Sequence, residues 1–257
     1  MRKTIHFMHV EMLRSLLSPK FLLAVVLLSA TIVLGNLDFF FKDSSLTEMH
    51  EQKEYLHSSL IAVFGKENIT FVLPLFAVLP FSSSYLEERE NGFLKSYLPR
   101  CGQNNYILSK IIVSAISSGI VVFLSALIVT IWGFVLYHQV SLFDFINQSN
   151  LWKEYSYIVL MAIMEGILWG TVGSVMGVYF ESLFMVFAGP FLMSYTLIIL
   201  TTRYFTQLSF LNPRNWLSNN GESQSWIIAT LTVLIIFAIT LHVILLVSKI
   251  KGNKFTL

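Results

Sequence analysis

The chain contains several apolar runs that are long enough to cross a lipid bilayer, and this feature constrains the fold more than any other. A transmembrane helix needs about 20 mostly apolar residues. Six runs are of this kind, at residues 21–41, 69–86, 107–137, 155–179, 183–202 and 226–248. Only 12% of the 257 residues are charged, which is about half the share found in soluble domains. The sequence therefore predicts an all-α membrane protein with a single transmembrane domain over residues 1–257.

The distribution of lysine and arginine predicts which side of the membrane each loop faces, because cytoplasmic loops carry an excess of these residues. With both termini in the cytoplasm, the inner segments hold eleven of the 17 Lys and Arg residues. The six outer residues are Lys42, Lys53, Lys66, Lys153, Arg203 and Arg214. We therefore expect an integral plasma membrane protein with cytoplasmic termini, a cytoplasmic loop at 87–106, and outer loops at 42–67 and 203–225.

Residues 1–19 have the pattern of an amphipathic helix that lies in the membrane interface. Apolar residues recur at helical spacing and basic residues supply a polar side, which is typical of interfacial helices. The apolar residues are Ile5, Met8, Met12 and Leu16, and the basic side holds Arg2, Lys3, His9 and Arg14. Pro19 ends the pattern. The alternative is that this segment forms a loose start to the first span.

The loop at residues 87–106 is short and charged, and it also has an apolar stripe. Its charged residues are Glu87, Glu88, Arg89 and Glu90, and its stripe consists of Phe93, Leu94, Tyr97 and Leu98. The stripe has helical spacing, the acidic residues suit a helix N-terminus, and Pro99 is expected to end the helix. Such a stripe suits a groove on a soluble partner. The alternative is a solvated connector that binds nothing.

Two motifs in the chain resemble those of the membrane subunit of type-2 ABC exporters. The first is "ERENG" at residues 88–92, followed by Pro99 and by Lys110 at the start of the third span. The second is "FLNPRNWL" at residues 210–217, where that family often has a proline-containing re-entrant element. The order of an amphipathic start, six spans and a charged loop after the second span is also similar to this family.

The resemblance implies a coupling helix between spans 2 and 3 that binds a cytoplasmic ATPase subunit, with two ATPase copies in the complex. The coupling residues would be Glu87, Glu88, Arg89, Glu90, Phe93, Leu94, Tyr97 and Leu98. It also implies a second permease subunit, either identical or homologous. The sequence has no P-loop, so we expect ATP and Mg²⁺ in the partner, and neither a cofactor nor a catalytic residue in this chain. The implied function is export of a hydrophobic or amphipathic substrate such as a peptide or drug.

The fourth apolar run combines a row of glycines with one carboxylate. Gly166, Gly170, Gly173 and Gly177 fall on one helix face, and small residues at such spacing let helices approach closely. Glu165 precedes this row. A carboxylate inside a membrane is costly unless it is protonated, paired or in contact with water. We interpret Glu165 either as a group in the translocation path or as a protonated structural residue.

Other function classes remain as alternatives. An ion-coupled secondary carrier would use Glu165 as its proton site, and a non-transporting membrane sensor or immunity protein would need no substrate path. An intramembrane protease of the glutamate type is disfavoured, because Asn91 and Gly92 follow the glutamates where that family's motif has an arginine. The net charge of +2 and the single cysteine, Cys101, predict neither a nucleic-acid partner nor a cysteine-based metal site.

Overall fold

The structure is a computed structural model that describes residues 2–37, 49–64, 67–137, 149–217 and 224–252. Every regular element in these ranges is a helix, which confirms the predicted all-α fold class. The α-helices are α1 (Arg2–Leu16), α2 (Pro19–Leu34), α4 (Met49–Phe64), α5 (Glu67–Ala77), α6 (Ser84–Glu90), α7 (Phe93–Cys101), α8 (Gln103–Leu136), α10 (Ser149–Phe180), α11 (Leu183–Ile199), α12 (Pro213–Leu217) and α13 (Gln224–Gly252). A π-helix, η1 (Leu200–Tyr204), and a 3₁₀-helix, η2 (Thr206–Leu211), lie between α11 and α12.

Four helices of the described chain are long and apolar enough to cross a membrane. They are Gln103–Leu136, Trp152–Phe180, Leu183–Tyr204 and Gln224–Ile250. Two bent pairs raise the number to six if each pair counts as one span. These pairs are Phe7–Leu16 with Pro19–Leu34, bent by 51°, and Ser58–Phe64 with Asn68–Ala77, bent by 63°. The chain thus has the helices of a membrane protein, with four to six candidate spans.

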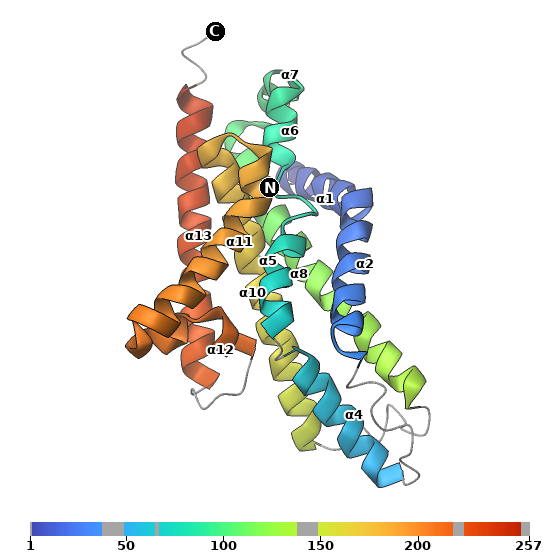
Figure 1. The fold of residues 1–257 in the computed structure, drawn as a ribbon. Coiled ribbons are helices and arrows are strands. Elements are labelled where there is room, and N and C mark those ends of the chain that lie inside the picture. The colour runs from blue at the N-terminus through green and yellow to red at the C-terminus, as the bar shows by residue number, and fades with distance from the viewer. Residues whose placement is uncertain (1, 38–48, 65–66, 138–148, 218–223, 253–257) are drawn as a thin grey trace.

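Helix α10 lies at the centre of the bundle, where it packs against α8, α11 and α13 (Figure 1). Within its most apolar window 72% of the residues are buried inside the protein, compared with 22% for α13. Most apolar side chains of α13 therefore face outward, as expected for a helix in contact with lipid.

The glycine row of α10 packs against other helices of the same chain. At each of the four positions an added Cβ would come closer to a neighbouring side chain than real Cβ atoms do. The nearest atoms would be Val122 Cγ2 at 2.5 Å for Gly166, Ser118 Oγ at 1.9 Å for Gly170, Val78 Cγ1 at 2.5 Å for Gly173 and Val186 Cγ2 at 2.6 Å for Gly177. The row therefore lets α8, the segment after α5, and α11 approach α10 closely.

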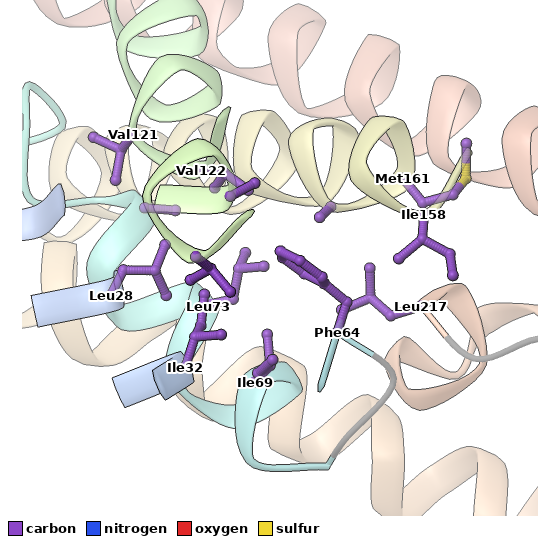
Figure 2. Packing of buried hydrophobic residues seen from close by; sticks show 14 of the residues in the cluster. Leu28, Ile32, Phe64, Ile69, Leu73, Val121, Val122, Ile158, Met161 and Leu217 are labelled. Carbon is purple, nitrogen blue, oxygen red and sulfur yellow. The ribbon is translucent and has the colours of Figure 1, made fainter. Parts of the chain in front are cut away.

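One apolar cluster joins the two halves of the chain around α10. Figure 2 shows Phe64 of α4 and Leu217 of α12 in the same cluster as Ile158 and Met161 of α10. Leu217 belongs to the segment 203–225, which the sequence assigns to an outer loop. The structure shows that α12 of this segment folds back onto the bundle, since Trp216 and Leu217 are almost fully buried.

Helices α1 and α2 meet at a sharp bend of 51° (Figure 1). Ser18 caps α2, because its Oγ accepts a hydrogen bond from the backbone N–H of Phe21 at 3.1 Å. Pro19 occupies the first turn of α2, where a missing N–H leaves no bond unmade. The amphipathic segment thus forms a helix that a bend separates from α2, and its place at a membrane surface stays a prediction.

Residues 69–86 form two helices rather than the single span predicted there. Helix α5 ends at Ala77, turns occupy residues 78–83, and α6 begins at Ser84. Pro80 lies among these turns and has no N–H to donate to a helix. The turns are held in place on α10, because Ser82 Oγ donates to the carbonyl oxygen of Gly170 at 2.9 Å.

The segment 42–67, expected to be an outer loop, contains the 16-residue helix α4. Its buried residues Leu56, Leu60, Val63 and Phe64 recur on one helix face and pack on the same core as α8 and α10. This apolar face makes a helix more stable than an extended loop here. Of the predicted span 21–41, residues 38–41 lie outside the described residues.

Candidate functional site

Helix α6 directs three consecutive charged side chains at three different parts of the chain. Glu87 pairs with Lys20 at the start of α2. Glu88 points into the interior between α1 and α8. Arg89 NH1 lies 2.8 Å from Glu181 Oε2, in the break between α10 and α11. Successive residues of a helix point about 100° apart, so one short helix contacts three separate neighbours.

Glu88 belongs to a buried charge network with Glu11 and Lys110. Lys110 Nζ lies 2.6 Å from Glu88 Oε1 and 3.1 Å from Glu11 Oε2. Glu11, Glu88 and Lys110 are 1%, 3% and 2% exposed, and such residues are almost never fully buried unless they are paired. The ammonium group also lies 4.7 Å from the centroid of the Phe81 ring, a cation–π distance.

Three further side chains complete the hydrogen bonds of the two carboxylates. Arg14 NH1 donates to Glu88 Oε1 and Tyr106 OH donates to Glu88 Oε2, both at 2.8 Å. Tyr97 OH donates to Glu11 Oε1 at 3.0 Å. We call the set of Glu11, Arg14, Glu88, Tyr97, Tyr106 and Lys110 the hub. Its two carboxylates and two cations balance in formal charge, and its members come from α1, α6, α7 and α8.

The hub fixes the position of α7 through Tyr97. Burial and the neighbouring Glu11 carboxylate raise the pKa of Tyr97 above its ordinary value, so the phenol remains a donor at neutral pH. The Tyr97 ring also contacts the ring of Phe7 in α1, with centroids 5.2 Å apart. A displacement of α7 therefore pulls on α1 directly.

Two glycines in left-handed conformations flank α7. Gly92 has φ +72° and Gly102 has φ +79°, a region that residues with a Cβ rarely adopt. Helix α7 lies next to α6 at the end of the bundle where α13 also ends (Figure 1). Pro99 lies inside α7 and does not end it as the sequence predicts; the helix ends at Cys101, and Gly102 is its C-cap. The two glycines make α7 a separate helical block between sharp turns.

The apolar stripe of α7 divides between the interior and the surface, which differs from the expected docking face. Leu94, Tyr97 and Leu98 pack against the chain's own buried cluster near Tyr106. Phe93 is 62% exposed.

The charged residues of this loop also differ from the expected docking face. Glu88 is 3% exposed and lies in the interior of the chain. Lys95 and Arg100 are exposed on α7, and Glu90 is exposed at the end of α6.

A second ion cluster joins α6 to α13. The Glu181 carboxylate forms two ion pairs. Its Oε1 lies 2.5 Å from Lys249 Nζ, and its Oε2 lies 2.8 Å from Arg89 NH1. The hydrogen bond from Lys249 and then that from Arg89 lower the pKa of the Glu181 carboxyl, and they outweigh its burial. Glu181 itself has φ +53°, an uncommon conformation for a residue with a side chain. Through these ion pairs, the break between α10 and α11 is joined to α6 and to α13.

Glu165 is fully buried in α10, away from the hub. Its Oε1 accepts a hydrogen bond from Trp169 Nε1 at 3.1 Å. Its Oε2 accepts none from the residues that the structure describes. Among those residues, no group of three His, Cys, Asp or Glu side chains could hold a metal ion.

Sequence reasoning did not identify Glu11, Tyr106 or Glu181 as parts of a site. The sequence analysis considered Lys110 only in the count of Lys and Arg residues and as part of the family motif. A lysine four residues into an apolar run was a usable signal, because ionisable residues in membrane helices are costly and require a partner. Nothing in the sequence indicated that Glu11, in a different helix, was one of its partners.

Comparison of the chain with protein-family models, with curated proteins and with solved structures finds no match in any of the three.

Proposed function

We propose that the chain is the permease subunit of an ATP-driven exporter of the ABC type, in which α7 is the coupling helix. The observation that supports this proposal most is the structure of α7 and its attachment to the bundle. It is a helix between two left-handed glycines, it lies at an end of the bundle, and its inner face is tied through Tyr97 to the buried hub. Force applied to α7 reaches α1 through Glu11 and Tyr97, and α8 through Lys110.

The exposed residues of α7 define the partner surface in this proposal. Phe93 is the apolar anchor, and Lys95 and Arg100 give the surface a positive charge. A partner that docks here would offer an apolar pocket rimmed by acidic side chains. In this proposal the acidic residues act within the chain: Glu88 is buried in the hub, and Glu87 pairs with Lys20 of α2.

A transporter of this kind also requires partner subunits and a defined orientation in the membrane, which are part of the proposal. The ATPase partner, in two copies, binds ATP and Mg²⁺, and a second permease subunit, identical or homologous, completes the path. The α7 end and both termini face the cytoplasm, and Glu165 lies in the translocation path. An ion-coupled carrier is the second candidate, because a buried carboxylate with a free oxygen can hold a proton. Transport that persists without ATP and requires an ion gradient would favour the carrier.

Phe93→Ala tests the docking surface. The tagged chain is purified from its native membrane, and co-purifying P-loop ATPase and substrate-stimulated ATP turnover are measured. Loss of a buried aromatic anchor costs about 1–3 kcal/mol of association, so we expect at least tenfold weaker recovery of the ATPase, a factor equal to about 1.4 kcal/mol. Phe184→Ala is the matched control, since Phe184 is 68% exposed and lies in the first turn of α11 at the same end of the bundle. Equal recovery with both variants would show that α7 is a connector.

A further inference from the structure

Helices α8 and α10 pack closely along one part of their length and separate along another. At Gly166 of α10 an added Cβ would lie 2.5 Å from Val122 Cγ2 of α8, so the two backbones are close there. Beyond this contact the helices diverge towards the end of the bundle where α4 lies (Figure 1). A cavity of about 650 Å³ occupies the space between them. This volume falls in the range of about 300–1,000 Å³ that is typical of ligand sites.

The cavity is lined by one apolar stripe from each helix. The α8 stripe runs from Phe123 to Val135 and the α10 stripe from Trp152 to Ile163. At 1.5 Å per residue each stripe is about 17 Å long, so the cavity is elongated along the helices. Val135 and Trp152 lie at or next to the ends of two candidate membrane spans. A cavity of this length reaches from the end of a span to about the middle of a hydrocarbon core, which is about 30 Å thick.

The wall of the cavity is too apolar to hold ordered water. None of the described residues that line it is charged. Three hydroxyl groups in the wall are already hydrogen bonded, those of Thr130 and Tyr155 to each other and that of Ser156 to the carbonyl oxygen of Lys153 at 3.0 Å. A buried water needs two to four polar partners, and apolar cavities remain dry. Because an empty space of this size forfeits packing contacts, the cavity suits an apolar occupant.

The cavity opens onto the outer surface of the bundle. Ile131 of α8 and Leu160 of α10 line it, and they are 62% and 49% exposed. Both helices are long and apolar enough to cross a membrane, so the opening faces lipid.

We propose that the cavity binds the acyl chain of a membrane lipid, with the polar head group at the level of Trp152. An acyl chain has the elongated shape of the cavity, needs no hydrogen bond from its wall and enters it directly from the bilayer. The length of the cavity matches the depth of one lipid leaflet, which is half of the hydrocarbon core. The site goes beyond the proposed export function, because lipid bound here fills the space between α8 and α10 whether or not an ATPase is docked.

Photolabelling of the purified full-length chain in a nonionic detergent tests the site. The probe is a phosphatidylcholine that carries a diazirine in the middle of a palmitoyl chain, and unlabelled phosphatidylcholine is the competitor. Peptide mapping after illumination should find saturable labelling, reduced by the competitor, in residues 123–135 and 152–163. Labelling of α13, where Val233 is 65% exposed outside the cavity, should not saturate.

Two neighbouring residues of α8 provide a variant and its matched control. Leu127 and Ile128 are 41% and 42% exposed, and of the two only Leu127 lines the cavity. Leu127→Trp places an indole in the cavity and removes packing contacts from the acyl chain, so saturable labelling should fall at least about tenfold. Ile128→Trp should be labelled like the unchanged protein.

A second variant keeps the test decisive if Leu127→Trp fails to fold. Leu160→Trp fills the cavity from α10 and should reduce labelling in the same way. Labelling unchanged in a folded cavity variant, or spread evenly over the lipid-exposed helices, would overturn the site.

A helix from a second copy of the chain is the other apolar occupant to test. Ile131→Cys is combined with Cys101→Ser, and disulfide cross-linking between copies is measured in the same detergent. We expect little cross-linking. Efficient cross-linking that added phosphatidylcholine does not reduce would overturn the lipid site in favour of an interface between copies. Neither measurement uses an ATPase, so failure of the lipid site leaves the docking proposal intact, and failure of an ATPase to co-purify leaves the labelling result unaffected.

Discussion

Glu11 of α1 and Lys110 of α8 are 99 residues apart in the chain, yet their charged groups meet at 3.1 Å in the interior. The contact joins the helix at the N-terminus to the longest helix of the bundle. Glu88 of α6 pairs with the same ammonium group, at 2.6 Å. A lysine between two buried carboxylates makes the assembly of this end dependent on all three helices at once.

Lys110→Met should be among the most damaging single changes outside the glycine row. It leaves two buried carboxylates without their shared cation, and breaking a buried ion pair on one side costs about 3–5 kcal/mol. Thermal unfolding of the purified protein, followed by size-exclusion chromatography, measures the loss. Lys95→Met is the control, because Lys95 is exposed on α7, and it should change stability by less than about 0.5 kcal/mol.

Adding Glu11→Gln and Glu88→Gln to Lys110→Met should restore part of the lost stability, since no buried charge then lacks a partner. A Lys110→Met protein as stable as the Lys95→Met protein would show that the network contributes nothing to folding.

Gly170→Ala should destabilise the bundle more than Gly119→Ala does. The new Cβ at position 170 would lie 1.9 Å from Ser118 Oγ and 2.5 Å from Ser118 Cβ, so α8 and α10 must separate. At position 119 the nearest atom is the side chain of Ile167 at 3.0 Å, which can rotate away. Overpacking of a close interface costs about 1–3 kcal/mol. Similar melting temperatures for the two variants would contradict this packing.

The sequence predicted the fold class and the glycine face because both depend on local patterns. Apolar runs of span length have few alternatives to helices, and four glycines at helical spacing lie on one face wherever the helix goes. The same reasoning failed at residues 78–83, where turns held by Ser82 and Gly170 interrupt an apolar run. Pro80 is the local signal for that break, because it has no N–H to donate, and the tertiary hydrogen bond from Ser82 to α10 holds the turns in place.

The hub was not predictable from a local pattern. Glu87, Glu88 and Arg89 form a run of charges in the sequence, and a run of charges usually indicates a solvated surface. Its actual partners lie in α2, α1, α8 and beyond α10, and only the folded chain brings them together. The stripe of α7 was predicted correctly as a set of residues on a helix, but three of its four residues pack against a buried apolar cluster of the same chain.

Acid should weaken the Glu181 cluster. The folded-state pKa of Glu181 is lowered, so its contribution to stability is fully present above the unfolded value, about 4.3, and is lost as the pH falls through the folded value. The difference in melting temperature between the unchanged protein and Glu181→Gln should therefore be constant above about pH 5.5 and should shrink below about pH 4.3.

Glu90→Gln, at an exposed position on the same end of the bundle, is the control for loss of a carboxylate. A Glu181→Gln difference that grows as the pH falls would have the wrong sign for this cluster.

Labelling from the two sides of the membrane tests the orientation that the docking proposal requires. Cys101→Ser first removes the native cysteine, and a new cysteine is then placed either at Ser96, exposed on α7, or at Ser45. The excess of Lys and Arg on the α7 side predicts that this side faces the cytoplasm. A membrane-impermeant maleimide added to intact cells should therefore label the cysteine at position 45 and leave that at position 96 unlabelled. Permeabilised cells should show labelling at both positions, which controls for accessibility. Labelling of position 96 from outside would place α7 away from cytoplasmic ATP, and no cytoplasmic ATPase could then dock on it.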